Sequence, residues 1–184
     1  MNGEVLATSD DGNLRVTIAQ DDDPMNPRTD YDNLASMIVV SQDWDMDKDP
    51  GPLGWVWKRL ASRYRTQEAV ALFMRYARIY HGATVVEHRP YNGPWSIFYL
   101  TREVADGPDG TPDPAAYVAG EIATWDQYLE GDIYGYVLEE RVIWRADGRP
   151  SRESWEVVDS CWGFYGREDV ASEARAVFRA HLTA

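Results

Sequence analysis

Residues 133–145 read IYGYVLEERVIWR, and residues 154–164 read SWEVVDSCWGF. Apolar residues recur along both stretches with the period of two that a half-buried β-strand requires. The connection between them, ADGRPSRE at 146–153, is rich in turn-forming residues, so the pattern predicts a long antiparallel hairpin. The residues expected to share one face of the first strand are Tyr134, Tyr136, Leu138, Val142 and Trp144, and those of the second are Val158, Trp162 and Phe164.

Other strands and helices are predicted on the N-terminal side of this hairpin and after it. Strands are expected at 13–20, 34–41, 84–87 and 96–101, and helices at 114–131 and from about residue 168 onward. The pattern is also helical from Trp55 to Tyr80, with Thr66 as a possible N-cap and Gly82 as the end. The apolar stripe of this helix comprises Ala69, Leu72, Phe73, Tyr76, Ala77 and Tyr80. The turn Asp10–Gly12 indicates an N-terminal hairpin or edge strand, and the Pro- and Gly-rich stretch 43–54 indicates a loop. The run 34–41 is apolar throughout, which is typical of a strand at the centre of a sheet.

The predicted fold class is α+β: a mainly antiparallel sheet with a long C-terminal hairpin, packed against two to three helices. The sequence has 184 residues, 44% of them hydrophobic, which is enough to build a sizeable core. It shows no internal repeat and no second core, so residues 1–184 are predicted to form a single domain.

No apolar stretch reaches the roughly 20 residues that a membrane helix needs, and the N-terminus does not resemble a secretory signal. We therefore expect a cytoplasmic protein without a membrane partner. Cys161 is the only cysteine, which excludes an intrachain disulfide and a Cys-rich zinc site.

The formal net charge is −13, and the charges are unevenly distributed along the chain. Residues 1–50 carry twelve acids and three bases, residues 51–105 three acids and eight bases, and residues 106–184 sixteen acids and seven bases. Net negative charge repels a phosphate backbone, so we expect no direct nucleic-acid binding unless the basic middle segment gathers on one face. An acidic surface instead suits partners with basic sites.

Eight acidic residues are the candidates for an interaction surface: Asp21, Asp22, Asp23, Asp30, Asp32, Asp126, Glu130 and Asp132. The first five lie with Asn26 and Asn33 in an oxygen-rich loop, which could bind Ca²⁺ or Mg²⁺ or could simply be a solvated loop with Asx turns. The ligand order of an EF-hand is missing, so we predict no metal site. Asn26, Arg28 and Asn33 are candidates for a structural motif in which a carboxylate of this loop holds Arg28.

Two further groups of residues could be catalytic, and each also has a simpler structural interpretation. Cys161 could be a nucleophile with His81 or His88 as base, but its strand setting favours a buried structural thiol. Asp126, Glu130, Asp132 and Asp159 could include an acid/base pair, although acidic faces produce such sets by chance. The spacing supports no catalytic residue, and we predict no cofactor because common nucleotide and hydrolase motifs are absent.

The segment WKRLASRYR at 57–65 mixes Lys58, Arg59, Arg63 and Arg65 with the apolar residues Trp57, Leu60 and Tyr64. Such a mixture can bind phosphates and stack on bases, here with help from Trp95, or it can be an ordinary solvated helix face.

Three segments carry a resemblance: DDDPMNPRTDYDNLASM at 21–37, TWDQYLEGDIYGYVLEE at 124–140 and EVVDSCWGFYG at 156–166. They resemble a family of small uncharacterised proteins of bacteriophages, plasmids and other mobile elements. The stretch IVVSQDWDMDKDPG after Met37 departs from the family, in which a turn with His, Arg and Tyr is common. The resemblance implies a genomic context and assigns no activity.

Three hypotheses follow from charge and resemblance together. The first is an acidic phage or plasmid accessory protein that mimics DNA and binds a basic site on a host protein, such as a defence-system component. The second is a metal-dependent hydrolase that uses the acidic loop. The third is a nucleic-acid-binding accessory protein that uses residues 57–65.

Overall fold

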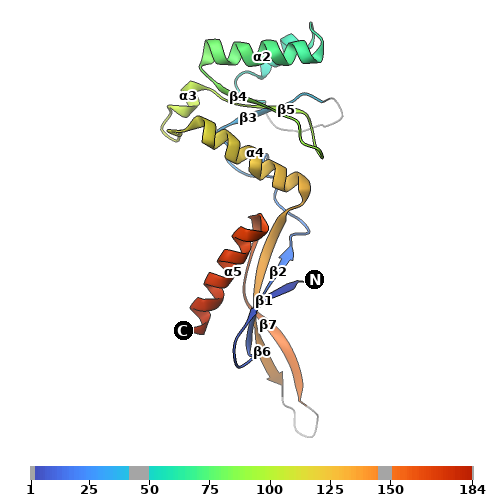
Figure 1. Cartoon of the computed structure of the whole chain (residues 1–184), viewed down its shortest axis with the longest axis vertical. Helices are drawn as coiled ribbons and strands as arrows, with labels where there is room; N and C mark the ends of the chain where they lie inside the picture. Colours follow the sequence, from blue (N-terminus) through green and yellow to red (C-terminus); the bar gives the residue numbers. More distant parts are fainter. Residues whose placement is uncertain (1–2, 42–49, 145–150, 184) are drawn as a thin grey trace. The chain divides into compact units, whose positions relative to one another are not determined.

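The computed structural model describes residues 3–41, 50–144 and 151–183 (Figure 1). These residues form five helices and two antiparallel sheets, which confirms the predicted α+β class and its long C-terminal hairpin. No helix in these ranges is long and apolar enough to cross a membrane. Most of the loop expected at 43–54 and of the connector expected at 146–153 lies outside the described residues.

The chain divides into two compact units. One, here called the terminal unit, comprises Met1–Met25 and Gly131–Ala184, and the other, the central unit, comprises Asn26–Glu130. Each unit has apolar clusters of its own, whereas the sequence pattern indicated one core. The single domain over residues 1–184 stays a prediction.

The terminal unit is a four-stranded sheet with one helix against it. The sheet order is β1-β2-β6-β7, formed by β1 (Glu4–Thr8), β2 (Leu14–Gln20), β6 (Ile133–Trp144) and β7 (Arg152–Tyr165), and it is followed by α5 (Arg167–Leu182). The predicted turn Asp10–Gly12 joins β1 to β2, so of the two expected alternatives the strand at 13–20 belongs to an N-terminal hairpin and is not an edge strand. Val16, Leu138 and Val170 are fully buried where α5 packs on the sheet.

The pairing of β6 with β7 contains two irregularities that change which residues share a face. Tyr134 lies opposite Phe164, but Tyr136 lies opposite Cys161, so β7 holds an extra residue between these pairs. A β-bulge of this kind reverses the alternation of side chains beyond it. Gly163 lies at this bulge with φ 87°, a left-handed backbone that favours glycine.

The predicted face Val158, Trp162 and Phe164 is therefore wrong. Phe164 packs beside Tyr136 on the α5 side, whereas Trp162 lies on the opposite face, with its ring over Gly135. Val158 is 46% exposed because a second register shift falls beside it. Two bulges in one strand defeat a prediction based on strict alternation.

The central unit is a three-stranded sheet with helices on both faces. Its strands are β3 (Ser36–Val39), β4 (Thr84–His88) and β5 (Ser96–Leu100), and its helices are α1 (Gly54–Ala61), α2 (Thr66–His81), α3 (Arg102–Ala105) and α4 (Pro114–Glu130). The sheet order is β3-β5-β4, so placing the run 34–41 at the centre of a sheet is wrong: β3 is an edge strand. That run is apolar because helical layers bury β3 on both faces.

The side chains of β5 alternate between two apolar cores. Ile97 and Tyr99 face the core under α1 and α2, and Phe98 and Leu100 face the core under α4. Figure 1 shows α2 and α4 on opposite faces of this sheet. The predicted helices at 66–82 and 114–131 are confirmed, except that Arg65 rather than Thr66 is the N-cap of α2. The central unit thus has three layers, helix on sheet on helix.

We expect Gly135→Ala to lower the free energy of unfolding by about 1–3 kcal/mol, because overpacking strains a filled interior. The added methyl group would lie 2.2 Å from the Trp162 ring. The control is Gly120→Ala on the exposed side of α4, where nothing lies within 4 Å of the new methyl group. Alanine is favoured over glycine in a helix, so the control should be neutral or stabilising. Urea unfolding measures both variants, and equal stabilities would contradict this packing.

Candidate functional site

The eight acidic candidates for an interaction surface are distributed over both units. The terminal unit holds Asp21, Asp22, Asp23 and Asp132, and the central unit holds Asp30, Asp32, Asp126 and Glu130. Within the described residues, no group of three or more His, Cys, Asp or Glu side chains could hold a metal ion. The metal-dependent hydrolase therefore has no ligand set among these residues, and we do not propose it.

Several of these carboxylates bind neighbouring groups of the same unit. Asp21 Oδ1 accepts a hydrogen bond from the Asp23 amide at 3.1 Å, and Asp30 Oδ2 accepts one from the Asn26 amide at 2.7 Å. Asp126 Oδ1 lies 2.8 Å from His88 Nε2. These bonds are typical of Asx turns and helix-surface pairs, in agreement with the solvated-loop interpretation.

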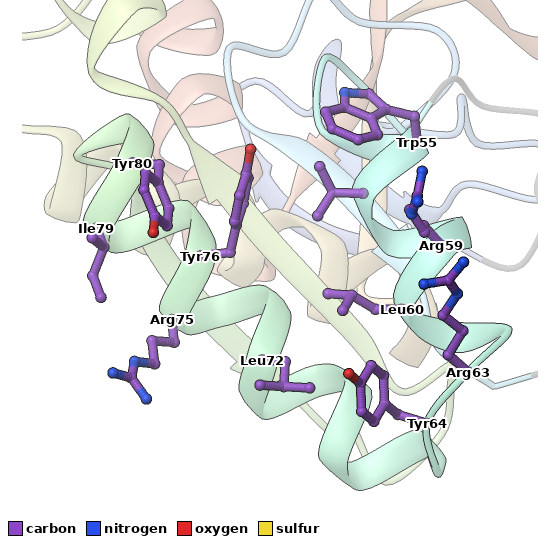
Figure 2. Close-up of a pocket in the computed structure, with 11 residues that line it drawn as sticks. Trp55, Arg59, Leu60, Arg63, Tyr64, Leu72, Arg75, Tyr76, Ile79 and Tyr80 are labelled. Carbon is purple, nitrogen blue, oxygen red and sulfur yellow. The ribbon is translucent and has the colours of Figure 1, made fainter.

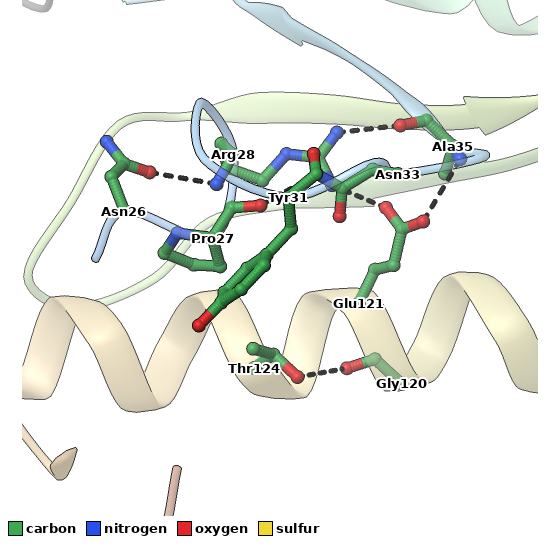
Figure 3. A network of polar contacts seen from close by, with 9 residues as sticks. All are labelled: Asn26, Pro27, Arg28, Tyr31, Asn33, Ala35, Gly120, Glu121 and Thr124. Carbon is green, nitrogen blue, oxygen red and sulfur yellow. Dashed lines mark hydrogen bonds and ion pairs between the residues drawn. The ribbon is translucent and has the colours of Figure 1, made fainter. Parts of the chain in front are cut away.

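Asn26, Arg28 and Asn33 do form a structural motif, at the start of the central unit (Figure 3). The Asn26 side chain accepts a hydrogen bond from the Arg28 amide at 2.9 Å, which closes an Asx turn. The Asn33 amide group donates to the Pro27 carbonyl at 2.7 Å and to the Tyr31 carbonyl at 2.9 Å. Two asparagine side chains thus fix the backbone on either side of Arg28.

Arg28 is 1% exposed and is held by Glu121 of α4. The expectation that a carboxylate of the acidic loop holds it is wrong, because the side chain points inward, between the loop and α4 (Figure 3). Its guanidinium also donates to the Ala35 carbonyl at 2.7 Å and lies 5.1 Å from the centre of the Phe98 ring. Glu121 in turn accepts from the Ala35 amide at 3.1 Å. The two charges of this network pair with each other and with the backbone of Ala35, as is typical of a structural contact.

Cys161 does not form the proposed catalytic pair within one unit. It lies in the terminal unit, whereas His81 and His88 lie in the central unit. The expectation of a buried thiol is wrong: Cys161 is exposed because β7 forms the edge of the sheet.

On the same strand Asp159 accepts a hydrogen bond from the Tyr136 hydroxyl at 3.3 Å. Burial and the Asp159 charge raise the pKa of Tyr136 to about 12, so this phenol is a donor at neutral pH.

The best candidate for a binding site is a groove between α1 and α2 in the central unit, with a volume of about 450 Å³ (Figure 2). We call it the α1–α2 groove. It is lined by Trp55, Val56, Arg59, Leu60, Arg63, Tyr64, Leu72, Arg75, Tyr76, Ile79 and Tyr80. None of these lining residues is acidic. A groove with apolar walls and a few converging charged groups is the usual form of a ligand site.

The charges of the groove are unbalanced. Arg59, Arg63 and Arg75 line it, and among the described residues none of their guanidinium groups forms an ion pair. The whole segment 54–81 carries six basic residues and one acidic residue, Glu68. Six of the eight bases of the basic middle segment, residues 51–105, therefore lie on the layer formed by α1 and α2, as nucleic-acid binding would require.

Large apolar side chains beside these arginines are exposed to solvent. Trp55 is 61% exposed, Tyr64 43% and Tyr80 72%. Tyr80 also packs against Tyr76, with ring centres 4.9 Å apart. An aromatic ring held open to solvent beside unpaired cations is typical of binding surfaces rather than of cores.

Only some of the residues that line this groove were predicted from the sequence as a binding surface. Residues 57–65 do contribute Arg59, Arg63 and Tyr64, but Trp57 packs edge-on against the buried Phe73 and does not line the groove. Trp95 is also elsewhere, covered by Arg89 at 3.9 Å. Leu72, Tyr76 and Tyr80 of α2 were predicted to lie on a buried stripe, but they line the groove. On α2 these residues form the row next to the buried residues Ala69, Phe73 and Ala77. A second apolar row beside the row that faces the core was the sequence feature that could have indicated the groove.

A hollow on the sheet of the terminal unit provides a contrast. Its volume is about 650 Å³, and it lies on the face opposite α5, beside Trp162 and Val157. Its charged lining residues, Arg15 and Glu139, bind each other at 2.7 Å. The arginine also lies over the Trp155 ring at 4.1 Å, so this hollow offers no unpaired charge to a ligand.

Comparison of the chain with protein-family models, with curated proteins and with solved structures gave no match. The resemblance to mobile-element proteins stays an expectation. Its DSCWGFYG segment has a structural role here, since it provides the bulge at Gly163 and the Trp162 ring that covers Gly135.

We expect Arg28→Met to lower the free energy of unfolding by about 3–5 kcal/mol, because the substitution leaves a buried carboxylate without its partner. The Glu121 side chain is only 9% exposed. The double variant Arg28→Met/Glu121→Met should be clearly more stable than the sum of the two single changes predicts, since neither charge then remains unpaired. Urea unfolding of the wild type, both single variants and the double variant measures this coupling. Simple additivity would contradict the pairing.

Proposed function

We propose that this protein is a binding protein that holds a negatively charged partner in the α1–α2 groove. One observation carries the proposal: the side chains of Arg59, Arg63 and Arg75 line a groove whose lining has no carboxylate. Arginine presents several donors in a planar fork that matches the oxygens of phosphate and carboxylate groups. An anionic partner would supply the countercharges that the lining lacks.

Local charge, rather than the net charge of −13, governs what this groove attracts. Exposed charges are largely screened beyond about 8 Å at physiological salt, so distant carboxylates contribute little at the groove. The six basic residues of segment 54–81 lie on one face of the central sheet. Helix α4, on the opposite face, contains no basic residue and ends with Asp126 and Glu130. This separation of charge across the sheet supports a directed approach of the partner.

A second candidate is the acidic accessory protein that binds a basic site on a host protein. The observation that favours it is the composition of the terminal unit, which carries sixteen acidic and eight basic residues, a net charge of −8. The resemblance to mobile-element proteins fits this role. Pull-down from a bacterial lysate at low and moderate salt is its test, with Asp21→Asn/Asp22→Asn/Asp23→Asn as the matched variant. A partner captured equally by both proteins would contradict a role for this cluster.

The groove proposal predicts that the variant Arg59→Gln/Arg63→Gln/Arg75→Gln loses affinity for a polyanion. A labelled heparin oligosaccharide is a suitable probe, and fluorescence anisotropy at 50 mM NaCl measures its binding. Each exposed ion pair contributes about 0.2–1 kcal/mol, so three should weaken binding by about threefold to a hundredfold.

The control variant changes the same number of charges outside the groove, as Lys58→Gln/Arg65→Gln/Arg102→Gln. These three side chains are exposed and do not line the groove. The control should retain most of the affinity. Equal losses in both variants would mean that the probe responds to overall charge, and the proposal would then be wrong.

A further inference from the structure

We infer that the occupant of the α1–α2 groove is a single strand of nucleic acid. The inference rests on the proposed function and names the class of ligand. It starts from the exposed rings of Trp55, Tyr64 and Tyr80, which an anion alone does not explain. A carboxylate or sulfate group needs only the arginines, whereas an unpaired base also offers a flat apolar face to each ring.

The rings and the cations are arranged along the groove in a way that fits a chain of repeating units. Figure 2 shows Trp55 at one end of the α1 side and Tyr64 at the other, with Arg59 and Arg63 between them. Arg59 lies in α1, and Arg63 lies in the turn that follows this helix. This row has a ring at each end and two cations between them, so bases of one strand could stack at its ends while phosphates bind in its middle.

The opposite wall of the groove repeats this combination. Arg75 and Tyr80 both come from α2, and Tyr80 is braced by Tyr76, whose ring centre lies 4.9 Å away. A braced ring loses little conformational freedom when a base stacks on it. Between the walls, Leu60 and Leu72 form an apolar floor. A strand with its bases turned inward would cover this floor and leave its phosphates near the guanidinium groups.

A duplex fits these side chains less well than a single strand does. Its bases are stacked on each other, so their faces are not accessible to Trp55 or Tyr80 unless they are extruded. An acidic peptide would satisfy the arginines but would leave the exposed rings without an aromatic or planar partner. Complementary charge and stacking together therefore favour unpaired nucleotides.

The test compares three labelled probes: a twelve-nucleotide oligo(dT), a duplex of equal length and a poly-glutamate peptide of equal charge. Fluorescence anisotropy gives the affinity of each at several NaCl concentrations between 50 and 200 mM. We expect oligo(dT) to bind at least tenfold more tightly than either alternative. An oligo(U) arm of the same length shows whether the sugar matters.

Two variants separate stacking from charge. Trp55→Ala/Tyr80→Ala should weaken oligo(dT) binding by about tenfold or more, without changing its salt dependence or the affinity for heparin. Arg63→Gln should reduce the slope of log affinity against log salt by about one. Tyr91→Ala is the matched control, because Tyr91 is 100% exposed and does not line the groove, and it should bind as the wild type does.

The outcomes distinguish this inference from the proposal beneath it. Tight binding of poly-glutamate that is insensitive to Trp55→Ala/Tyr80→Ala would overturn the nucleic-acid inference and leave the anion-binding groove intact. A preference for the duplex would likewise overturn it. Failure of heparin and of all the other probes to bind would overturn both. Circular dichroism of each variant verifies that the fold is retained.

Discussion

The central unit depends on the buried contact between Arg28 and Glu121. A guanidinium that is 1% exposed is stable only when partners replace the water around it. Glu121 binds this cation and also the Ala35 amide, while Arg28 binds the Ala35 carbonyl. Both backbone groups of Ala35 are thereby attached to the α4 side, and β3 begins at the next residue, Ser36. The ion pair thus fixes where the first strand of the sheet lies.

Hydrogen bonds and packing contacts connect β3, through β5, to the two helices that form the groove. Strand β3 pairs with β5, and the Tyr99 hydroxyl of β5 donates to the Pro50 carbonyl at 2.6 Å and accepts from the Leu53 amide at 3.0 Å. These bonds fix the residues just before α1, and Phe73 of α2 packs edge-on against both Trp57 and Tyr99. Contacts on the sheet-facing side of α1 and α2 therefore position the two helices that form the groove. Their outer side remains available for exposed arginines and rings.

The parts of the fold that the sequence predicts well are long and periodic: the hairpin, α2, α4 and α5. Three features escaped prediction because they depend on contacts between distant residues or on irregular backbone. Arg28 and Glu121 are 93 residues apart, so no local pattern connects them. The bulges in β7 reverse the side-chain alternation, which put Trp162 on the wrong predicted face. The groove was found only in part because α1 covers just part of α2, so rows of apolar residues extend beyond the core.

The irregular pairing of β7 also affects how this strand can meet other chains. An edge strand of 14 residues exposes a long row of backbone donors and acceptors, and a regular row of that length is a template for aggregation. Each bulge bends the strand and interrupts the spacing of these groups, so an incoming straight strand could match only a few consecutive residues. The glycine that permits the first bulge therefore also makes β7 a poorer template for an added strand.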